Sequence, residues 1–302
     1  MSKTTAAGIR GSFIAFPAGS DYGVSGYARH GREKTLKGSG DMFRIVTINL
    51  EQDRKRWRER HKLISAELAA LKPDIISFNE VCVPIQSAKI LRDAITLETG
   101  ISYNLVQQTK VNGLAEVEGE ALLTRYPVIE TGNLDYQTRD MVALVARVLI
   151  DATPIDVYVT HLFMSRGDDS LRLFQVQQLL AWIDSRPDAA ASIICGDFNA
   201  TIDKPSAARM ASRFRPTQTT APTAFTPLSD DDGTISHPYW PRMDRCIDYI
   251  WVSEAIDVVA SEVCLNHPAS DDPTLWPSDH AGVWADLNLS IAANEGPAHA
   301  QG

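Results

Sequence analysis

The chain has 302 residues, of which 44% are hydrophobic, and its formal net charge at pH 7 is -9. This apolar fraction is sufficient for a folded core, and the length is compatible with one large α/β domain. The acidity argues against a protein built to bind duplex DNA, because basic side chains that neutralise phosphates supply most of that affinity.

Residues 1–41 are rich in Gly, Ala and Ser and show no sustained periodicity, and the sequence changes character at Met42. We interpret residues 1–41 as an N-terminal extension of uncertain order. Two alternatives stay open here: Met42 is itself a translation start, or residues 13–16 form a short strand that docks on the main domain. The main domain is expected over residues 42–290, followed by a frayed tail over residues 291–302.

Strands and helices alternate from Phe43 onward. The apolar run over 43–50 predicts a buried strand, and an apolar face from Trp57 to Leu71 at steps of three and four predicts a helix that ends before Pro73. Further strands are expected at 74–78, 102–108, 121–123, 142–150, 155–160, 192–195, 246–252 and 281–289, further helices at 84–98 and 173–183, and loops over 200–242. No repeat or linker divides this body, so one domain is expected.

Polar residues recur at the ends of the apolar runs: Asn49, Glu80, His161, Asp197, Asn199, Asp248, Asp279 and His280. Each alone has an ordinary structural explanation, such as an Asx turn at Asp197 or a structural histidine at His161. Together they offer carboxylates, histidines and asparagines at the ends of separate strands. Such a set suits a hard divalent cation with oxygen ligands and hydrogen-bond donors for a phosphate.

Seven short segments follow one another in a recognisable order: TINL at 47–50, FNEV at 78–81, EGEALLTRYP at 118–127, THL at 160–162, CGDFNA at 195–200, IDYI at 247–250 and SDH at 278–280. They resemble the signature blocks of the endonuclease/exonuclease/phosphatase superfamily. The resemblance covers about residues 43–289 and implies an α/β fold, a four-layer α/β/β/α sandwich of two mixed sheets flanked by helices. The chain departs from the family at Asn79, where Gln is more frequent, and at Cys246, where a more polar residue is expected.

The same resemblance assigns roles to individual residues. It implies that Glu80, helped by Asn49 and Asp279, holds Mg²⁺ or Mn²⁺. It implies that Asp197 orients and deprotonates the attacking water and that Asn199 donates a hydrogen bond to the phosphate or the water. It also implies that His161 and His280 donate to phosphate oxygens, with Glu118 and Asp248 as their respective carboxylate partners.

These roles predict a metal-dependent hydrolase of phosphate esters, and the acidic chain favours a phosphodiesterase of small-molecule or lipid-like substrates. The alternative is a DNA or RNA endonuclease or exonuclease, which a basic groove would support, so nucleic acid is a partner that is not favoured. A catalytically silent binding scaffold is disfavoured, because such a protein has no reason to keep a carboxylate–histidine cluster. The sequence makes no prediction of oligomeric state.

Two charged segments have competing interpretations. The basic run from Arg54 to Lys62 is interpreted as a solvated helix surface rather than a nucleic-acid patch. The Asp230–Asp232 segment, followed by His237, Tyr239 and Trp240, is interpreted as an exposed turn, with a substrate-selecting lip at the cleft as the alternative.

The four cysteines are widely scattered and lack the spacing of a zinc site, and Cys195 is expected in the core. No apolar stretch is long enough to span a bilayer, and no classical signal peptide is evident. These features favour a cytoplasmic protein.

Overall fold

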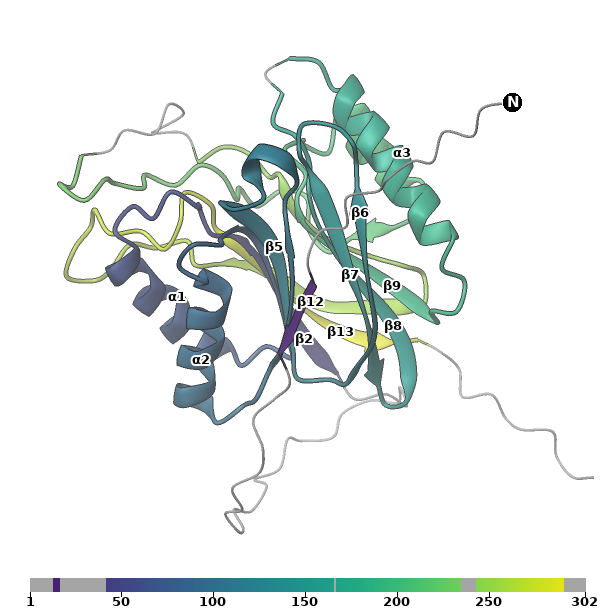
Figure 1. The fold of residues 1–302 in the computed structure, drawn as a ribbon, viewed down its shortest axis with the longest axis horizontal. Coiled ribbons are helices and arrows are strands. Elements are labelled where there is room, and N and C mark those ends of the chain that lie inside the picture. Colours follow the sequence, from purple (N-terminus) through teal and green to yellow (C-terminus); the bar gives the residue numbers. More distant parts are fainter. Residues whose placement is uncertain (1–12, 17–41, 166, 235–242, 291–302) are drawn as a thin grey trace, which may run out of the picture.

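The computed structural model describes residues 13–16, 42–165, 167–234 and 243–290. Two β-sheets pack face to face, and helices cover their outer faces (Figure 1). On one side lie α1 (Trp57–Leu71) and α2 (Ser87–Thr99), and on the other lie α3 (Ser170–Asp184) and α4 (Pro205–Ala211). This arrangement confirms the four-layer α/β/β/α sandwich that the sequence predicts.

Among the described residues, sheet A has seven strands in the order β1 (Phe13–Phe16), β4 (Asn104–Thr109), β5 (Glu118–Thr124), β3 (Ile75–Cys82), β2 (Phe43–Asn49), β13 (Gly282–Leu289) and β12 (Ile256–Cys264). Sheet B has six, in the order β10 (Arg215–Pro216), β11 (Asp248–Val252), β9 (Ala191–Asp197), β8 (Thr153–His161), β7 (Val142–Ile150) and β6 (Val128–Asp135). Both sheets are mixed. Strands β2 and β3 are parallel in sheet A, and strands β8 and β9 are parallel in sheet B.

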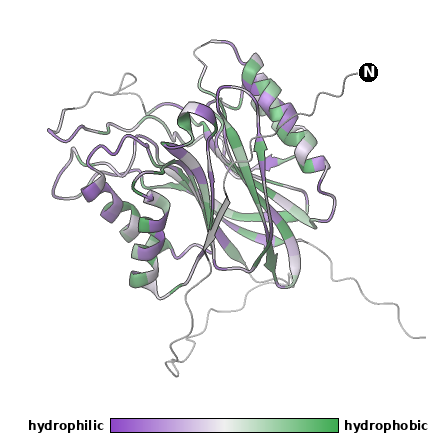
Figure 2. Cartoon of the chain, viewed as in Figure 1, coloured by the Kyte–Doolittle hydropathy of each residue, from purple (hydrophilic) through white to green (hydrophobic). Residues whose placement is uncertain are grey.

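Three apolar cores separate the four layers. One lies between the sheets and is built from alternate residues of their strands, such as Ile45, Val157 and Ile193. A second joins sheet A to α1 and α2, and a third joins sheet B to α3 and α4. Figure 2 shows the corresponding concentration of hydrophobic residues in the strands and the mixed surface of the helices. Within the described residues, no helix combines the length and apolar character needed to cross a bilayer.

Several elements depart from the sequence expectation or resolve an alternative. Strands β6 and β12 lie at sheet edges and are half-exposed, so they lack the apolar pattern on which strand prediction relies. Helix α4 is only seven residues long and begins with Pro205, inside the segment that was expected to be loop. Residues Phe13–Phe16 form β1, which pairs antiparallel with β4, so these four residues of the predicted extension are part of sheet A.

The basic run does not behave as a simple solvated helix face. Arg60 is completely buried, and its guanidinium donates to the carbonyl oxygens of Leu50 (2.8 Å), Pro277 (2.9 Å), Glu51 (3.2 Å) and Lys55. The prediction of a solvated surface is therefore wrong for this residue. A planar five-donor group can join several carbonyls at once, and here it ties the loop after β2 to the loop before β13.

Replacing Arg60 with Met should lower the free energy of unfolding by about 3 kcal/mol, because buried carbonyl oxygens lose their donors. Arg58→Met provides the control, since Arg58 lies on the same helix but is exposed; its effect should stay within about 0.5 kcal/mol. Urea denaturation followed by tryptophan fluorescence measures both values. Equal effects of the two substitutions would contradict a tying role for Arg60.

Candidate active site

Every second side chain of a strand lies on the same face of its sheet, and this places polar groups at one edge of the inter-sheet core. In β9, Ile193 and Cys195 face that core, and Asp197 follows on the same face at the strand end. In β8, Val159 faces the core and His161 follows two residues later. Because β8 and β9 are parallel, their carboxyl ends coincide, and His161 pairs in register with Asp197.

Sheet A supplies its polar groups at the same edge. Asn49 ends β2 on the face that Ile45 presents to the inter-sheet core. Glu80 belongs to β3, at an irregularity in its pairing with β5, and its φ of 54° lies in the left-handed region. Such conformations are unfavourable for residues other than Gly and concentrate at functional sites. Glu51 (φ 55°) and Asn199 (φ 48°), which border the same cavity, share this conformation.

Asn79 joins the two sheets at this edge. Its side-chain oxygen accepts from the backbone N–H of Asp197 at 2.9 Å, and its amide nitrogen donates to the carbonyl of Thr160 at 3.0 Å. The same nitrogen donates to Glu120 at 2.6 Å. Gly196 permits this close approach: with φ of 132°, a Cβ there would lie 2.0 Å from the Thr160 oxygen and 2.9 Å from the Asn79 oxygen.

Asp248, His280 and Asp197 form one polar chain. The Nδ1 atom of His280 lies 2.9 Å from Asp248 Oδ2, and its Nε2 atom lies 3.8 Å from Asp197 Oδ2. Burial alone would lower the pKa of His280, but the carboxylates of Asp248, Asp279 and Asp197 raise it well above its ordinary value. His280 is therefore held as an imidazolium whose Nε2–H faces the site. The pKa of Asp197 is raised to about 7, mainly by burial and by the charge of Asp248.

His161 lies on the other side of Asp197. Its Nε2 atom is 3.2 Å from the Asn199 amide nitrogen and 3.7 Å from Asp197 Oδ2. Its Nδ1 atom is 3.6 Å from Glu118, the expected partner, but the ammonium of Lys110 is closer, at 3.3 Å. The Lys110 ammonium and the Asn199 amide nitrogen both only donate, so the acceptors near an N–H of His161 are the carboxylates of Glu118 at Nδ1 and Asp197 at Nε2.

Lys110 is a buried cation that no sequence motif indicated. It is 1% exposed, forms an ion pair with Glu118, and lies 3.9 Å from Glu120. Burial opposes ionisation of Glu118, but His161 and Lys110 together lower its pKa to about 2. The pKa of Glu120 is raised well above its ordinary value, chiefly by burial. Lys110 therefore holds Glu118 as a carboxylate beside His161.

Carboxylates crowd the sheet A side of the site. Burial, together with the charges of Asp279 and Glu80, raises the pKa of Glu51 to about 10. Burial, Glu118 and Asp279 likewise raise the pKa of Glu80. Asn49 donates from its amide to Glu80 at 2.9 Å and to Asp197 at 3.3 Å. Mutual repulsion of this kind is relieved when a cation binds, so the donor set fits a hard divalent metal ion.

Two groups of side chains bring their ligand atoms close enough to hold a metal ion: Glu80, Glu118 and His161, and Asp197, Asp248 and His280, with the atoms of each group within 4.8 Å of one another. Carboxylates prevail in both, which favours Mg²⁺ or Mn²⁺ over softer ions. The expected set of Asn49, Glu80 and Asp279 shares Glu80 with the first group.

The structure brings together every site residue that the sequence predicted. A cavity of about 410 Å³ is lined by Glu80, Glu118, His161, Asp197, Asn199, Asp279 and His280, and also by Glu51, Gln52, Lys110, Met141, Phe163, Met164 and Phe225. Asn49 and Asp248 lie behind this wall and bind its members. Glu120 could have been predicted as a site residue from the sequence, because it lies two residues after Glu118 and therefore on the same face of the strand. Glu51 and Lys110 come just after strands, and no motif in the sequence marks them as site residues.

The Asp230–Asp232 segment is not part of this wall. Asp231 accepts from the backbone N–H of Arg56 at 2.8 Å, and Asp230 lies 3.7 Å from the Lys55 ammonium. The three aspartates border a neighbouring hollow together with residues 53–59. His237, Tyr239 and Trp240, which the lip hypothesis also used, lie outside the described residues.

Comparisons with known proteins agree with this arrangement. The model of the Endonuclease/Exonuclease/phosphatase family matches residues 46–280. No curated protein matches the sequence.

Several solved structures share the fold. A family protein from Bacteroides thetaiotaomicron is 15% identical with a TM-score of 0.66, over 84% of this chain and 100% of that chain. D. rerio TDP2 complexed with a single-strand DNA product is 16% identical with a TM-score of 0.64, over 82% and 99%. The human Nocturnin catalytic domain with bound sulfate is 22% identical with a TM-score of 0.62, over 83% and 97%.

Lys110→Met should lower the free energy of unfolding at pH 7 by about 3 kcal/mol, because a buried carboxylate loses its cation. The folded-state pKa of Glu118 is depressed from 4.5 to about 2, so its ionised form contributes stability above pH 4.5 that is lost as the pH falls toward 2. The difference between wild type and variant should therefore narrow below about pH 4.5.

Urea denaturation at pH values from 7 downward measures this difference. The matched control is Lys89→Met, since Lys89 is exposed and should show almost no effect at any pH. A Lys110→Met difference that stays constant or widens on acidification would refute the assigned ion pair.

Proposed function

The chain belongs to the endonuclease/exonuclease/phosphatase family, whose members are metal-dependent phosphoesterases, and from this premise we propose that it is a phosphodiesterase of small-molecule or lipid-like substrates. One observation carries the proposal. The Asp197 carboxylate oxygen Oδ2 lies between two imidazoles, 3.7 Å from Nε2 of His161 and 3.8 Å from Nε2 of His280, at the wall of a small cavity. A carboxylate flanked by two such groups suits a water attack on a phosphate.

Asp197 is proposed as the group that orients the water and takes its proton. A pKa of about 7 matches this role, because a general base works best when its pKa is near the operating pH. The proposed donors are the Nε2–H groups of His280 and His161, together with the Asn199 amide. They would stabilise the negative charge that accumulates on the phosphate oxygens, where fixed donors in a water-poor site are most effective.

Two carboxylates and an amide are proposed to hold Mg²⁺ or Mn²⁺: Glu80, Asp279 and Asn49. When bound, such an ion polarises a phosphoryl oxygen and offsets negative charge on the leaving oxygen. Glu118 is proposed to keep His161 oriented, and Asp248 to keep His280 protonated. The intact set of ionisable groups argues against a silent scaffold.

The preference for small substrates rests on charge and size. The cavity of about 410 Å³ is within the usual range for small-molecule sites, and its wall contains five acidic side chains and a single lysine, unlike the basic groove that a polyanion requires. Basic side chains of the run from Arg54 to Lys62 form ion pairs with acidic side chains of the same chain. Arg56 pairs with Glu59 at 2.8 Å and with Asp272 at 2.6 Å, while Lys55 pairs with Asp53 at 2.9 Å.

A nuclease is the second candidate, because one structural neighbour, TDP2, is bound to a single-strand DNA product. We also propose a cytoplasmic location, since all four cysteines are free and buried, as a reducing compartment allows.

Chelation should abolish turnover of bis-p-nitrophenyl phosphate, and Mg²⁺ or Mn²⁺ should restore it. Glu80→Gln should raise the metal concentration needed for half-maximal turnover by at least about tenfold, because one charged ligand is lost and the metal binds more weakly. The control Glu98→Gln removes the same charge from an exposed site on α2 and should leave the metal titration unchanged. Full turnover by exhaustively chelated protein would exclude this mechanism.

Asp197→Asn and His280→Ala should each lower kcat for the same diester by about a hundredfold or more, the usual scale for losing a positioned acid–base group. Asp257→Asn and His267→Ala are matched controls at exposed positions and should retain full activity. Thermal denaturation checks that each variant is folded. Near-normal kcat in a folded Asp197→Asn variant would show that the base has been assigned wrongly.

A further inference from the structure

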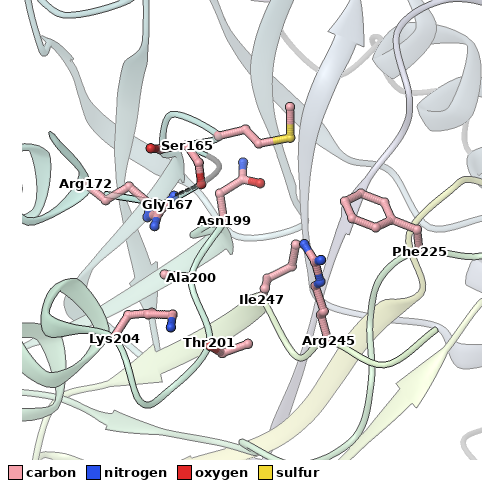
Figure 3. Close-up of a pocket in the computed structure, with 11 residues that line it drawn as sticks. Ser165, Gly167, Arg172, Asn199, Ala200, Thr201, Lys204, Phe225, Arg245 and Ile247 are labelled. Carbon is pink, nitrogen blue, oxygen red and sulfur yellow. Dashed lines mark hydrogen bonds between the residues drawn. The ribbon is translucent and has the colours of Figure 1, made fainter. Parts of the chain in front are cut away.

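A second cavity, of about 490 Å³, adjoins the catalytic cavity, and we call it the basic subsite (Figure 3). The two cavities share three lining residues, Met164, Asn199 and Phe225. One of these, Asn199, is a proposed donor to the reacting phosphate. A substituent attached to a phosphate in the catalytic cavity can therefore extend past Asn199 into the basic subsite.

The two cavities differ in the charged side chains of their walls, since acidic side chains predominate in the catalytic cavity. The wall of the basic subsite contains Arg172, Lys204 and Arg245, and no carboxylate belongs to it among the described residues. These cations come from distant parts of the chain: α3, the residue before α4, and the segment before β11. Figure 3 shows Arg172 and Lys204 on one side and Arg245 on the other. A cluster of three cations beside an acidic catalytic cavity, on a chain of net charge -9, is an attractive site for an anion.

The cations are held in different ways. Arg172 is 4% exposed and fixed, with Nε donating to Asp169 at 2.6 Å and a terminal nitrogen donating to the Ser165 carbonyl at 3.1 Å. Lys204 lies 3.1 Å from Asp203, and Arg245 lies 3.7 Å from Asp244. The side chains of these two aspartates are 68% and 57% exposed, and exposed ion pairs are weak, so neither of these two pairs prevents an anionic ligand from binding.

An apolar contact links the basic subsite to catalysis. The ring of Phe225 packs edge-on against His280, with 5.2 Å between ring centroids. The guanidinium of Arg245 lies over the same ring, 5.9 Å from its centroid. Phe225, which is buried and lines both cavities, thus lies between the anion-attracting side chain and the proposed donor imidazole.

We propose that the basic subsite binds a second phosphate-sized anion on the same substrate, so that the preferred substrate is a phosphodiester with a phosphate monoester on one of its ester arms. This inference rests on the proposed function, because the scissile phosphate must occupy the catalytic cavity. A cavity of about 490 Å³ has room for such a substituent, and three cations belong to its wall. The subsite is thus assigned to one adjoining anion and not to a long polyanion.

A pair of chromogenic probes tests the proposal: thymidine 5′-(4-nitrophenyl phosphate) and the same compound with a 3′-phosphate. The wild type with Mg²⁺ or Mn²⁺ should show a kcat/KM at least about tenfold higher for the 3′-phosphorylated probe, the scale expected for charge-assisted hydrogen bonds to a second phosphate. The double variant Lys204→Gln/Arg245→Gln should lose most of this advantage through KM and should hydrolyse the unphosphorylated probe normally.

The control Lys72→Gln/Lys89→Gln removes the same charge from exposed positions on the sheet A side and should keep the full advantage. Thermal denaturation verifies folding, and Lys204→Gln alone provides a milder version of the test. No preference for the 3′-phosphate in the wild type, or an equal loss in both double variants, would overturn the proposal. A comparable further gain for each added phosphate of a short oligonucleotide would also overturn it, in favour of a polyanion groove.

If the proposed function is wrong, the outcome differs from a failure of the basic subsite alone, because the wild type would then hydrolyse neither probe with either metal. The basic subsite is tested in that case by calorimetric binding to the Asp197→Asn variant. Thymidine 3′,5′-bisphosphate should bind at least about tenfold more tightly than thymidine 5′-monophosphate, and this difference should disappear when Lys204→Gln/Arg245→Gln is added. Equal affinity for the two nucleotides would refute the subsite independently of catalysis.

Discussion

The carboxamide of Asn79 is the interaction on which the geometry of the site depends. It belongs to sheet A, yet it holds the backbone N–H of Asp197 and the carbonyl of Thr160, which belong to the two parallel strands of sheet B. The inter-sheet core is apolar up to this edge, where Asn79 and the longer contact from Asn49 to Asp197 add hydrogen bonds between the sheets. Asn79 thereby helps to set the distance between the two sheets next to Asp197. Gly196 has no Cβ and so leaves the space that this contact requires.

A second constraint is charge. The edge gathers more carboxylates than cations, and burial makes their repulsion costly. The chain balances part of it from within. Lys110 neutralises Glu118, and the imidazolium of His280 faces Asp248 and Asp197. Arg60 joins the adjacent loops through backbone carbonyl oxygens and does not pair with a carboxylate of the site. The remaining excess lies around Glu80 and Glu51, whose pKa values are raised by burial and by neighbouring carboxylates, a repulsion that a bound cation would relieve.

The apolar runs predicted the strands and the polar groups at their ends, because both are local properties of the sequence, whereas the four-layer sandwich was implied by the resemblance of the ordered motifs to a family. His161, Asp197 and Asp248 could be placed in this way. The role of Asn79 could not, since it depends on how closely the two sheets pack. Lys110 and Arg60 were missed or misread because only long-range contacts bury them. The edge strands β6 and β12 gave no clear pattern, as one side of each faces solvent. The basic subsite escaped prediction because its cations come from three distant segments.

The mechanism proposed for this site requires that Glu80, with Asp279 and Asn49, holds the cation while Asp197 and the two histidines act on the phosphate beside it. Its most direct test is a crystal structure of the protein soaked with Mn²⁺ and inorganic phosphate, with anomalous scattering used to locate the metal. The account predicts a manganese peak on the order of 2 Å from a Glu80 oxygen, with phosphate oxygens within hydrogen-bond distance of His161, His280 and Asn199. A fully occupied metal held by Asp197, Asp248 and His280, with Glu80 uninvolved, would contradict it.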